Sequence, residues 1–468
     1  MKLAELMTTL QPHQQRAVER MSDPEQEGLI LMHGLGSGKT LSAIAVADAL
    51  GLPADVVLPA ALQANFAKEL VKHTKPGAGP DTQIRSLELT GRTGGLQRPL
   101  LIVDEAHRAR NPTKTRQALQ EAAAKKRLLL TGSVMYNNPA DSAALINLVA
   151  GRRVLPATPS EFESRYVVED NYRPNALMRL LGAKPRSGLA VNPKRKDELR
   201  KIFSKYIDYH PSSTENFPSR VDETVYAPLS PKQRQVYDTL LEAAPPWVAY
   251  NMRYNLPPTK SEATQLNAFL TGIRQAANTT RPFRSDQLDV SPKLDLAAQN
   301  LKKMLDEDPQ HKALVYSNFL DAGVRPMSER LTAAGIPHHI FSGDQPKKVR
   351  DQFVRDYNDN KVRALLVSGA GSEGLDLKGT NLVQVLEPHW NEERIKQVIG
   401  RAIRYKSHEH LPKEKQQVLV QRYLSTLGGK AQPKPDDGSV DLYLKAMSER
   451  KDKLNQMFRE LMQPEEKS

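Results

Sequence analysis

The stretch from Leu29 to Leu50, LILMHGLGSGKTLSAIAVADAL, decides the fold. It opens with a short apolar run, which is typical of a buried parallel strand. A glycine-rich loop follows, and the run from Leu41 onward has the pattern of a helix that Gly51 ends. A strand, a glycine loop and a helix in this order form the usual setting of a phosphate-binding loop. The stretch therefore predicts a parallel α/β domain that binds a phosphorylated ligand.

The glycine loop has the composition that ATP binding requires. Small residues let backbone N–H groups close around phosphates, and the helix N-terminus adds positive potential. Lys39 is expected to reach the β- and γ-phosphates, and the Thr40 hydroxyl is expected to ligate Mg²⁺. The first glycine of the full consensus falls on His33, which is the one departure. The predicted nucleotide-binding residues here are His33, Gly34, Leu35, Gly36, Ser37, Gly38, Lys39 and Thr40.

Two carboxylates follow the apolar run Leu100 to Val103, in the tetrapeptide DEAH. Asp104, at a strand end beside the loop, is expected to hold Mg²⁺, partly through water. Glu105 can then orient and deprotonate the water that attacks the γ-phosphate. Alone the tetrapeptide is a weak signal, but after a buried strand and a phosphate loop it becomes a strong one.

The residues alone leave the roles of two further features open. Thr131-Gly132-Ser133 follows the apolar run Leu128 to Leu130, and either couples the nucleotide site to a neighbouring surface or caps a helix. Gln14 lies just upstream of the first strand and can read adenine through its amide, although a surface glutamine is the commoner outcome.

The alternation of strands and helices divides the chain into four predicted regions. Residues 1–151 and 290–427 each read as a parallel sheet wrapped by helices. Residues 152–289 hold many prolines and read as helical, basic and loop-rich. Residues 428–468 read as a turn-rich linker and a helix that packs back on the body through Val440, Tyr443, Met447, Leu454, Met457, Phe458 and Leu461.

Composition narrows the class of protein. The 468 residues carry a formal net charge of +13, which suits a polyanionic partner such as nucleic acid but also fits a generic basic surface. Cysteine is absent, which removes disulfides, thiol catalysis and a cysteine-bound structural zinc and favours a reducing, intracellular setting. No apolar run approaches the ~20 residues of a membrane helix, and the first residues lack the layout of a secretory signal.

The motifs of the first region, in this order, are similar to the first lobe of superfamily-two helicases and translocases. The longer run DEAHRARNPTKTRQAL…KKRLLLTGSVMYNNPADSAALINLV resembles the Swi/Snf-type DNA translocases, including Arg108, Asn111 and the pair Asn137-Asn138. Val56 to Phe66 resembles the next DNA-contact motif of that family. The resemblance thus implies nucleic-acid contacts at Pro59, Asn65, Arg108 and Asn111.

The likeness continues through the second region. Ile273 to Asn278 and Ser291 to Asp295 resemble the segment that enters the second lobe, and Ala313 to Phe319 resembles its first strand. Ser368 to Leu377 resembles the loop that senses nucleotide and strand. Gln397 to Arg404 matches the arginine-finger motif Q-x-x-G-R-x-x-R. The resemblance implies catalytic roles for Gln397, Arg401 and Arg404, nucleotide contacts at Gly374 and Asp376, and nucleic-acid contacts at Ser317, Asn318, Gly369, Gly371, Ser372 and Trp390.

Ile403 and Lys406-Ser407 depart from chromatin remodellers and, with His33, look more like motors of large DNA viruses and phages. The poxviral nucleoside triphosphate phosphohydrolase belongs to that group. The resemblance implies two RecA-like lobes and an ATP- and Mg²⁺-dependent translocase on double-stranded DNA that displaces bound protein or remodels branched DNA. It also implies an RNA polymerase or another nucleoprotein as partner, and a location in the host-cell cytoplasm or the virion.

Two other functions stay open. One is a strand-separating helicase or branch-migration enzyme, and the other is a DNA-binding or polymerase-associated scaffold with a vestigial ATPase. The basic run from Lys184 to Lys201 either clamps a duplex or forms a solvated charged face. Trp390 either contacts DNA or packs inside the protein.

Overall fold

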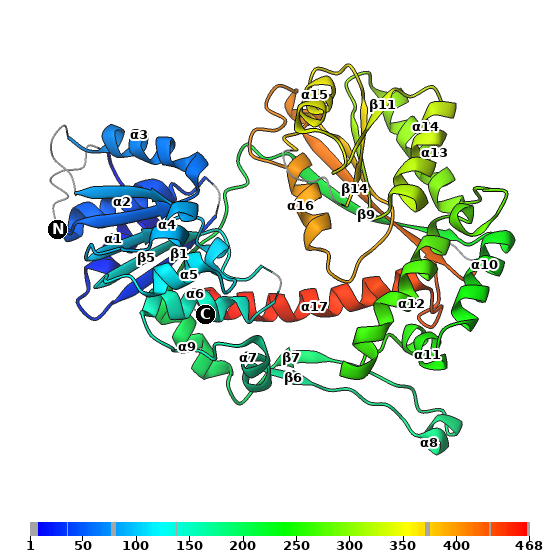
Figure 1. Cartoon of the computed structure of the whole chain (residues 1–468), viewed down its shortest axis with the longest axis horizontal. Helices are drawn as coiled ribbons and strands as arrows, with labels where there is room; N and C mark the ends of the chain where they lie inside the picture. The colour runs from blue at the N-terminus through cyan, green and yellow to red at the C-terminus, as the bar shows by residue number, and fades with distance from the viewer. Residues whose placement is uncertain are drawn as a thin grey trace. The chain divides into compact units, whose positions relative to one another are not determined.

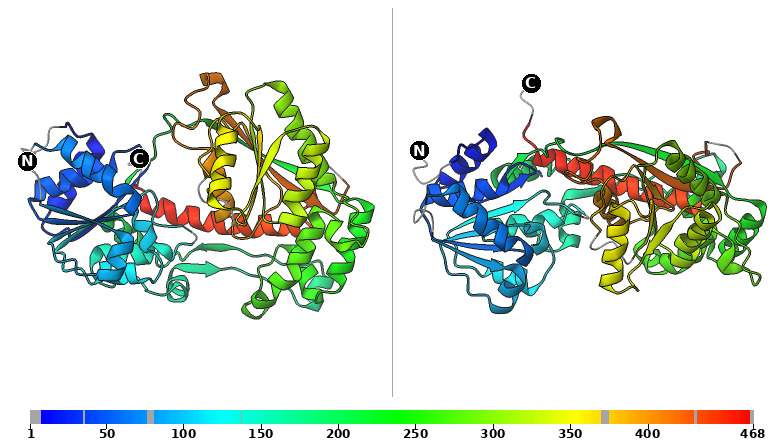
Figure 2. Two further views of the ribbon diagram at one scale, coloured as in Figure 1. Left: turned by 45° about the horizontal axis from the view of Figure 1, so that its top comes forward. Right: turned by 90° about the horizontal axis from the view of Figure 1, so that it is seen from above.

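The chain divides into two compact units, each built around a parallel sheet (Figure 1). Unit 1 comprises Met1–Glu169, Leu189–Thr214 and Lys451–Ser468, and unit 2 comprises Asp170–Gly188 and Glu215–Arg450. Helices lie on both faces of each six-stranded sheet (Figures 1 and 2). The predicted pair of parallel α/β lobes is therefore confirmed. This computed structural model describes residues 8–34, 36–75, 81–136, 138–369, 375–429 and 432–465.

The sheet of unit 1 has the strand order β3-β2-β4-β5-β1-β8, and neighbouring strands pair in parallel. Its strands are β1 (Gly28–His33), β2 (Ala54–Leu58), β3 (Thr82–Ser86), β4 (Leu100–Val103), β5 (Lys126–Thr131) and β8 (Ile207–His210). Its α-helices are α1 (Pro12–Ser22), α2 (Lys39–Leu50), α3 (Gln63–His73), α4 (Leu87–Thr93), α5 (Lys114–Gln120), α6 (Asp141–Ala150), α7 (Pro159–Tyr166) and α9 (Lys196–Tyr206). Smaller elements are the 3-10 helices η1 (Ala60–Leu62) and η2 (Ala106–Ala109) and the antiparallel strands β6 (Val167–Glu169) and β7 (Leu189–Val191).

Successive residues of the central strands pack into two different cores. In β1, Leu29 and Leu31 pack with α1, α2 and α3, whereas Ile30 and Met32 pack on the opposite face with α6, α7 and α9. This division follows from the two-residue period of a strand, which turns alternate side chains to opposite faces. Because both faces are covered, the strands read as continuous apolar runs, which is why the sequence revealed them.

The sheet of unit 2 has the strand order β11-β12-β10-β13-β14-β9, also with parallel pairing. Its strands are β9 (Ser219–Pro228), β10 (Ala313–Ser317), β11 (His338–Phe341), β12 (Ala364–Ser368), β13 (Leu382–Val385) and β14 (Gln417–Thr426). Its helices are α8 (Ala176–Leu180), α10 (Pro231–Glu242), α11 (Pro246–Tyr254), α12 (Lys260–Asn278), η3 (Arg281–Phe283), α13 (Pro292–Glu307), η4 (Leu320–Val324), α14 (Arg325–Ala333), α15 (Lys347–Asn358), α16 (Glu393–Ala402) and η5 (Lys413–Lys415).

The last helix, α17 (Val440–Met462), contributes to the core of each unit in turn. Val440 and Tyr443 pack with α10, α11 and α12, while Leu454 and Phe458 pack in the core of unit 1. The predicted helix is confirmed. The prediction that Met457 belongs to its buried apolar face is wrong, because this side chain is 39% exposed.

The stretch 152–289, expected to be helical and loop-rich, also supplies strands to both sheets. β8 adds to the edge of the unit 1 sheet beside β1, and β9 adds to the edge of the unit 2 sheet beside β14. Each is an edge strand of mixed polarity, so neither shows the continuous apolar run of a central parallel strand. One of the chain boundaries between the two units falls between Thr214 and Glu215, inside the predicted inter-lobe region.

Among the residues that the structure describes, no helix combines the length and the apolar character needed to span a bilayer.

Candidate active site

The glycine loop joins β1 to α2 at the carboxyl end of the unit 1 sheet, as predicted. Gly36 and Gly38 have φ of +76° and +74°, a left-handed conformation that favours glycine over any side chain. Gly38 immediately precedes α2, so the N–H groups of the first helical turn point toward the loop. The Ser37 hydroxyl donates a 2.6 Å hydrogen bond to Gly34 O, which fixes the loop internally. The backbone is thus shaped to surround an anion.

A cavity of about 450 Å³ opens beside this loop in unit 1. The loop contributes Lys39 and Thr40 to its wall, and the DEAH segment contributes Asp104 and Glu105. Its other walls are lined by Gly36, Ser37, Gly38, Leu41, Leu58, Leu62, Asn65, Phe66, Glu69 and His73. A volume of this size is in the range of small-molecule sites. The structure therefore brings the predicted phosphate, Mg²⁺ and water-activating residues of unit 1 to one cavity.

Lys39 lies near the carboxylates of Asp104 and Glu105 inside this cavity. Burial lowers the pKa of Lys39, while the negative charges of Asp104 and Glu105 oppose that shift. The Lys39 ammonium donates a 3.0 Å hydrogen bond to His33 O at the entrance of the loop. Burial raises the pKa of Asp104, although its carboxylate accepts a 2.8 Å hydrogen bond from Glu105 N.

Glu105 adopts a backbone conformation that ordinary residues rarely adopt. Its φ of +51° and ψ of +43° lie in the left-handed region, directly after β4 ends. A non-glycine residue held there costs free energy, and such strain gathers at functional sites. The Glu105 carboxylate lies 3.3 Å from His107 Nε2. The geometry thus presents Glu105 at the cavity, and activation of water by its carboxylate stays a prediction.

His107 connects the DEAH segment to the segment after β5. Its Nδ1 lies 3.2 Å from the Thr131 hydroxyl, and its ring stacks on Tyr136 with centroids 4.9 Å apart. Burial first, then the nearby arginines, lowers the pKa of His107 to about 4, so the ring is neutral near pH 7. The coupling role suggested for Thr131-Gly132-Ser133 thus has a physical connection. The DEAH pattern by itself does not predict a role for its fourth residue, His107.

Gln14 approaches the loop from α1, and both polar atoms of its amide have backbone partners. Gln14 Nε2 donates a 3.1 Å hydrogen bond to Gly38 O, and Gln14 Oε1 accepts a 2.8 Å bond from Gln11 N. The side chain is buried and supports the loop. Recognition of adenine by this amide stays a prediction.

Two loop positions lie behind the phosphate loop rather than in the cavity. The His33 side chain is fully buried and bonds to Asp208 on β8, so its prediction as a direct nucleotide contact is wrong for the side chain. Gly34 is also buried, and it packs so closely against Ser212 that a Cβ at position 34 would lie 2.1 Å from the Ser212 backbone. Leu35 lies outside the described residues.

The predicted nucleic-acid residues of unit 1 differ in accessibility. Pro59 is buried directly after β2, whereas Asn65 is exposed on α3 and lines the same cavity as the phosphate loop. Arg108 and Asn111 are exposed, and Arg108 pairs loosely with Glu88 at 3.6 Å. Arg108 and Asn111 are therefore both exposed and separate from that cavity, and nucleic-acid contact at all four positions stays a prediction.

The arginine-finger motif of unit 2 does not lie wholly on a helix. α16 ends at Ala402, so Arg401 occupies its last turn and Arg404 lies beyond it. The prediction that both arginines share one helical face is wrong for this reason. Arg404 Nη1 lies 3.4 Å from Asp376 Oδ1, and both side chains are exposed. Gln397 is exposed on α16 and bonds to Glu393.

A buried carboxylate organises the carboxyl end of the unit 2 sheet. Glu387, 1% exposed, accepts 2.9 Å hydrogen bonds from the Ser317 hydroxyl and a 2.8 Å bond from Asn278 Nδ2. The Asn318 backbone N–H also donates to it. Ser317 is fully buried, so its prediction as a direct nucleic-acid contact is wrong, because its hydroxyl holds this carboxylate instead. Asn318 is partly exposed and keeps that prediction.

Two more predicted residues of unit 2, Gly369 and Trp390, are less accessible. Gly369 is buried, and a Cβ there would lie 3.3 Å from Arg394 Nη1 and 3.5 Å from the Tyr316 hydroxyl. Trp390 packs partly buried against the core formed by α10, α11, α12 and α17, which favours its packing role. The predicted residues Gly371, Ser372 and Gly374 lie outside the described residues.

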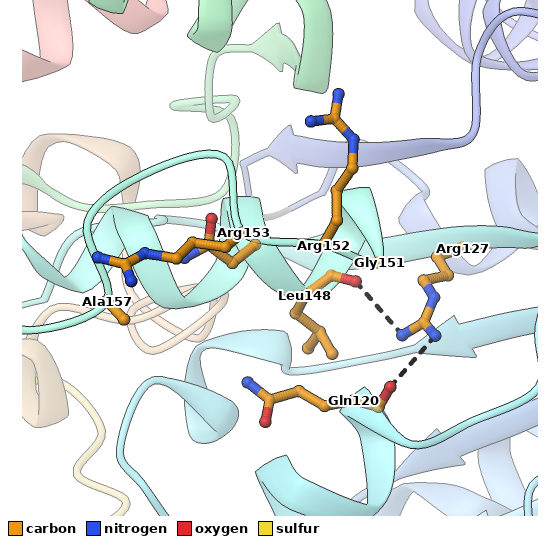
Figure 3. A pocket seen from close by; sticks show the side chains of 8 residues that line it. Gln120, Arg127, Leu148, Gly151, Arg152, Arg153 and Ala157 are labelled. Atoms are coloured by element: carbon orange, nitrogen blue, oxygen red, sulfur yellow. Dashed lines mark hydrogen bonds between the residues drawn. The ribbon is translucent and has the colours of Figure 1, made fainter.

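A second cavity, of about 250 Å³, lies near the amino end of β5 in unit 1 and is lined by Arg127, Arg152 and Arg153 (Figure 3). The Arg127 guanidinium donates 2.9 Å bonds to the carbonyl oxygens of Leu119 and Ala122 and longer bonds to Gln120 O and Leu148 O. These carbonyls lie in or just after the last turns of α5 and α6, where a cation is favourable. Arg127 thus stabilises two helix ends. This structural role explains why an arginine lines the cavity.

We expect Arg127→Met to lower the free energy of unfolding by about 1–3 kcal/mol, because buried carbonyls lose their donor. Urea denaturation would measure the change. The matched control is Arg153→Met, which lines the same cavity but loses only an exposed pair with Glu161 at 2.8 Å. Equal urea midpoints for the two variants would contradict the capping role.

Comparison with known proteins identifies the family. Residues 91–282 match the model of the SNF2-related domain, and residues 296–406 match the helicase conserved C-terminal domain. A putative ATP-dependent RNA helicase of Acanthamoeba polyphaga mimivirus is 30% identical over 97% of this chain and 96% of its own length. A termination factor NPH-I homolog of African swine fever virus is 25% identical over 93% of this chain and 75% of its own length.

One solved structure supports the fold. The helicase domain of Hef from Pyrococcus furiosus superposes with a TM-score of 0.51 at 14% sequence identity, covering 90% of this chain and 96% of that chain. Four observations point to the same family: the two parallel α/β lobes, the cavity formed by the phosphate loop and the DEAH segment, the two domain matches, and the viral relative that matches over nearly its full length. The chain belongs to the SNF2-related family of superfamily-two, nucleic-acid-dependent ATPases, of the type found in large DNA viruses.

Proposed function

We propose that the protein is a translocase that couples ATP hydrolysis to movement on double-stranded DNA and so displaces bound protein or remodels branched DNA. The observation that carries the proposal is the unit 1 cavity, where the phosphate loop, Lys39, Asp104 and Glu105 lie together. A scaffold with a vestigial ATPase would have no need to keep Glu105 in a strained conformation beside that loop.

Residues of the cavity fit a magnesium ion. Asp104 has no basic side chain within 4.0 Å in the described parts of the chain, and burial has raised its pKa, so a bound cation would stabilise its charged form. Thr40 and Asp104 would hold the ion, partly through water. When bound, Mg²⁺ would neutralise part of the negative charge on the β- and γ-phosphates.

The protein's own groups would then divide the chemistry. Lys39 binds the phosphates, and Glu105 orients the attacking water and accepts its proton. We propose that Arg401 and Arg404, carried by unit 2, complete the site and stabilise charge on the transferring phosphoryl group. Hydrolysis would therefore require the two units to close, and alternate closing and opening would move them along a phosphate backbone.

Double-stranded DNA as the track is supported by the Swi/Snf-like motifs around Arg108 and Asn111 and by the net charge of +13. Phosphate contacts would give binding that weakens with salt and shows little sequence preference. The African swine fever virus relative is named a termination factor, which supports an RNA polymerase as the displaced partner. The mimivirus relative is named an RNA helicase, which makes RNA the competing track.

The experiment is to measure ATP hydrolysis by the full chain with duplex DNA, single-stranded DNA and RNA at one salt concentration. We expect duplex DNA to stimulate most. Greater stimulation by RNA, or unwinding of a forked substrate, would favour the helicase alternative.

A further inference from the structure

β8 lies at the edge of the unit 1 sheet, directly behind the phosphate loop. It pairs with β1 so that Asp208 stands opposite Leu31 and His210 stands opposite His33, the last residue before the loop. The chain continues from β8 through Thr214 and enters unit 2 at Glu215. The last strand of unit 1 therefore contacts the strand from which the ATP loop begins.

Asp208 on this strand is a buried carboxylate surrounded by three side-chain donors, which are two arginines and one histidine. Arg16 on α1 donates two 2.8 Å hydrogen bonds to its two oxygens, and Arg20 adds a 3.2 Å bond. His33 Nε2 lies 2.8 Å from Asp208 Oδ1. Burial alone would raise the pKa of Asp208, but the hydrogen bonds from His33 and Arg16 hold it well below its usual range. The carboxylate is therefore charged and can only accept.

The charge on Asp208 fixes the state of His33. Because Asp208 only accepts, the shared proton must sit on His33 Nε2. Burial lowers the pKa of His33, and its Nδ1 is buried with no hydrogen-bond partner among the residues that the structure describes. His33 is thus neutral, and the side-chain hydrogen bond that orients it within the described part of the chain is the one to Asp208. The carbonyl of the same residue accepts the hydrogen bond from the Lys39 ammonium.

Backbone and ring contacts reinforce the same connection. Gly34 N donates a 3.0 Å hydrogen bond to His210 O, two residues beyond Asp208. The His210 ring stacks on His13 with centroids 3.8 Å apart, and His13 Nε2 lies 2.6 Å from Ser37 O in the loop. β8 therefore holds the loop at His33, at Gly34 and, through His13, at Ser37.

We propose that Asp208 is a positioning residue for ATP binding. By holding the His33 side chain, Asp208 fixes the position of the first residue of the phosphate loop and of the His33 carbonyl, which orients Lys39. Most loops of this kind begin with a glycine, and the pairing of His33 with Asp208 replaces that glycine with a side chain that needs a partner. The proposal rests on the proposed role of the loop in binding ATP. Asp208 does not line the cavity, so it would act on ATP through His33.

The test is a double-mutant cycle with Asp208→Asn, His33→Gly and both changes together. Dissociation of a fluorescent ATP analogue with Mg²⁺ is measured, followed by KM and kcat for ATP. We expect Asp208→Asn to weaken ATP binding about tenfold and raise KM, with little change in kcat, because a charged hydrogen bond is lost. In the His33→Gly background the same change should have no further effect on ATP binding. If the glycine variant does not fold, His33→Ala completes the cycle.

The matched control is Asp55→Asn, which removes an equally buried carboxylate from β2 of the same sheet, where it accepts a 3.1 Å bond from Arg98 N. Asp55 does not line the cavity, so this variant should lose stability without losing ATP affinity. Equal ATP affinities for the two variants, or additive effects in the cycle, would overturn the positioning role. If the wild-type protein failed to bind ATP, the proposed function itself would fail, and the two outcomes are therefore distinguishable.

Discussion

Arg404→Ala should lower kcat for ATP hydrolysis by about a thousandfold, because an arginine that neutralises transition-state charge contributes that much in related phosphoryl transfers. Arg404 belongs to unit 2, whereas the phosphate loop belongs to unit 1, so ATP binding itself should change little. Its exposed pair with Asp376 contributes little to stability, since such surface pairs are weak. Single-turnover hydrolysis and fluorescent ATP binding would separate the two effects.

The control for Arg404 is Arg355→Ala, which removes an exposed arginine from α15 of the same unit. It should leave kcat unchanged. Arg404→Lys should remain mostly inactive, because an ammonium lacks the planar fork of a guanidinium. Retention of wild-type kcat by Arg404→Ala would contradict the proposed catalytic role of Arg404.

Lys39→Ala should reduce ATP hydrolysis at least about 100-fold, as expected when one preorganised donor to a reacting anion is removed. The variant also loses the only side-chain hydrogen bond to His33 O that the described structure contains, so ATP affinity should fall as well. Duplex binding without nucleotide should persist, since Lys39 lines the nucleotide cavity. Steady-state hydrolysis and a gel-shift titration would measure both.

Lys126→Ala is the matched control for Lys39, because Lys126 is also a partly buried lysine that donates to carbonyl oxygens, here those of Met21 and Asp23. It lies away from the cavity and should retain ATP hydrolysis. If Lys39→Ala hydrolysed ATP as fast as Lys126→Ala, the assigned phosphate loop would be wrong. A wild-type protein without hydrolysis would instead favour the scaffold alternative.

The central strands and the first half of the site could be predicted from the sequence because they have local patterns. β1, β4 and β10 are continuous apolar runs, and the loop and the carboxylates follow two of these strands directly. β8 and β9 could not be predicted in the same way. They are edge strands with mixed polarity, and their pairing with β1 and β14 joins segments distant in sequence.

The roles of single residues depended on contacts that no local pattern contains. Asp208 lies 175 residues from His33, and Glu387 lies 70 residues from Ser317, yet each carboxylate fixes the other side chain. Motif likeness marks such positions but does not show whether a side chain faces a ligand or the interior. Ser317 and His33 occupy motif positions that predict a ligand contact, yet both side chains are buried.

Displacement of a third strand from duplex DNA tests the central claim most directly, because a motor that moves along intact duplex removes the third strand without separating the other two. With ATP, the wild-type protein should displace the third strand, and Lys39→Ala and Arg404→Ala should not. Failure of the wild-type protein to displace it, together with ATP-dependent unwinding of single-strand-tailed DNA or RNA, would contradict translocation on double-stranded DNA.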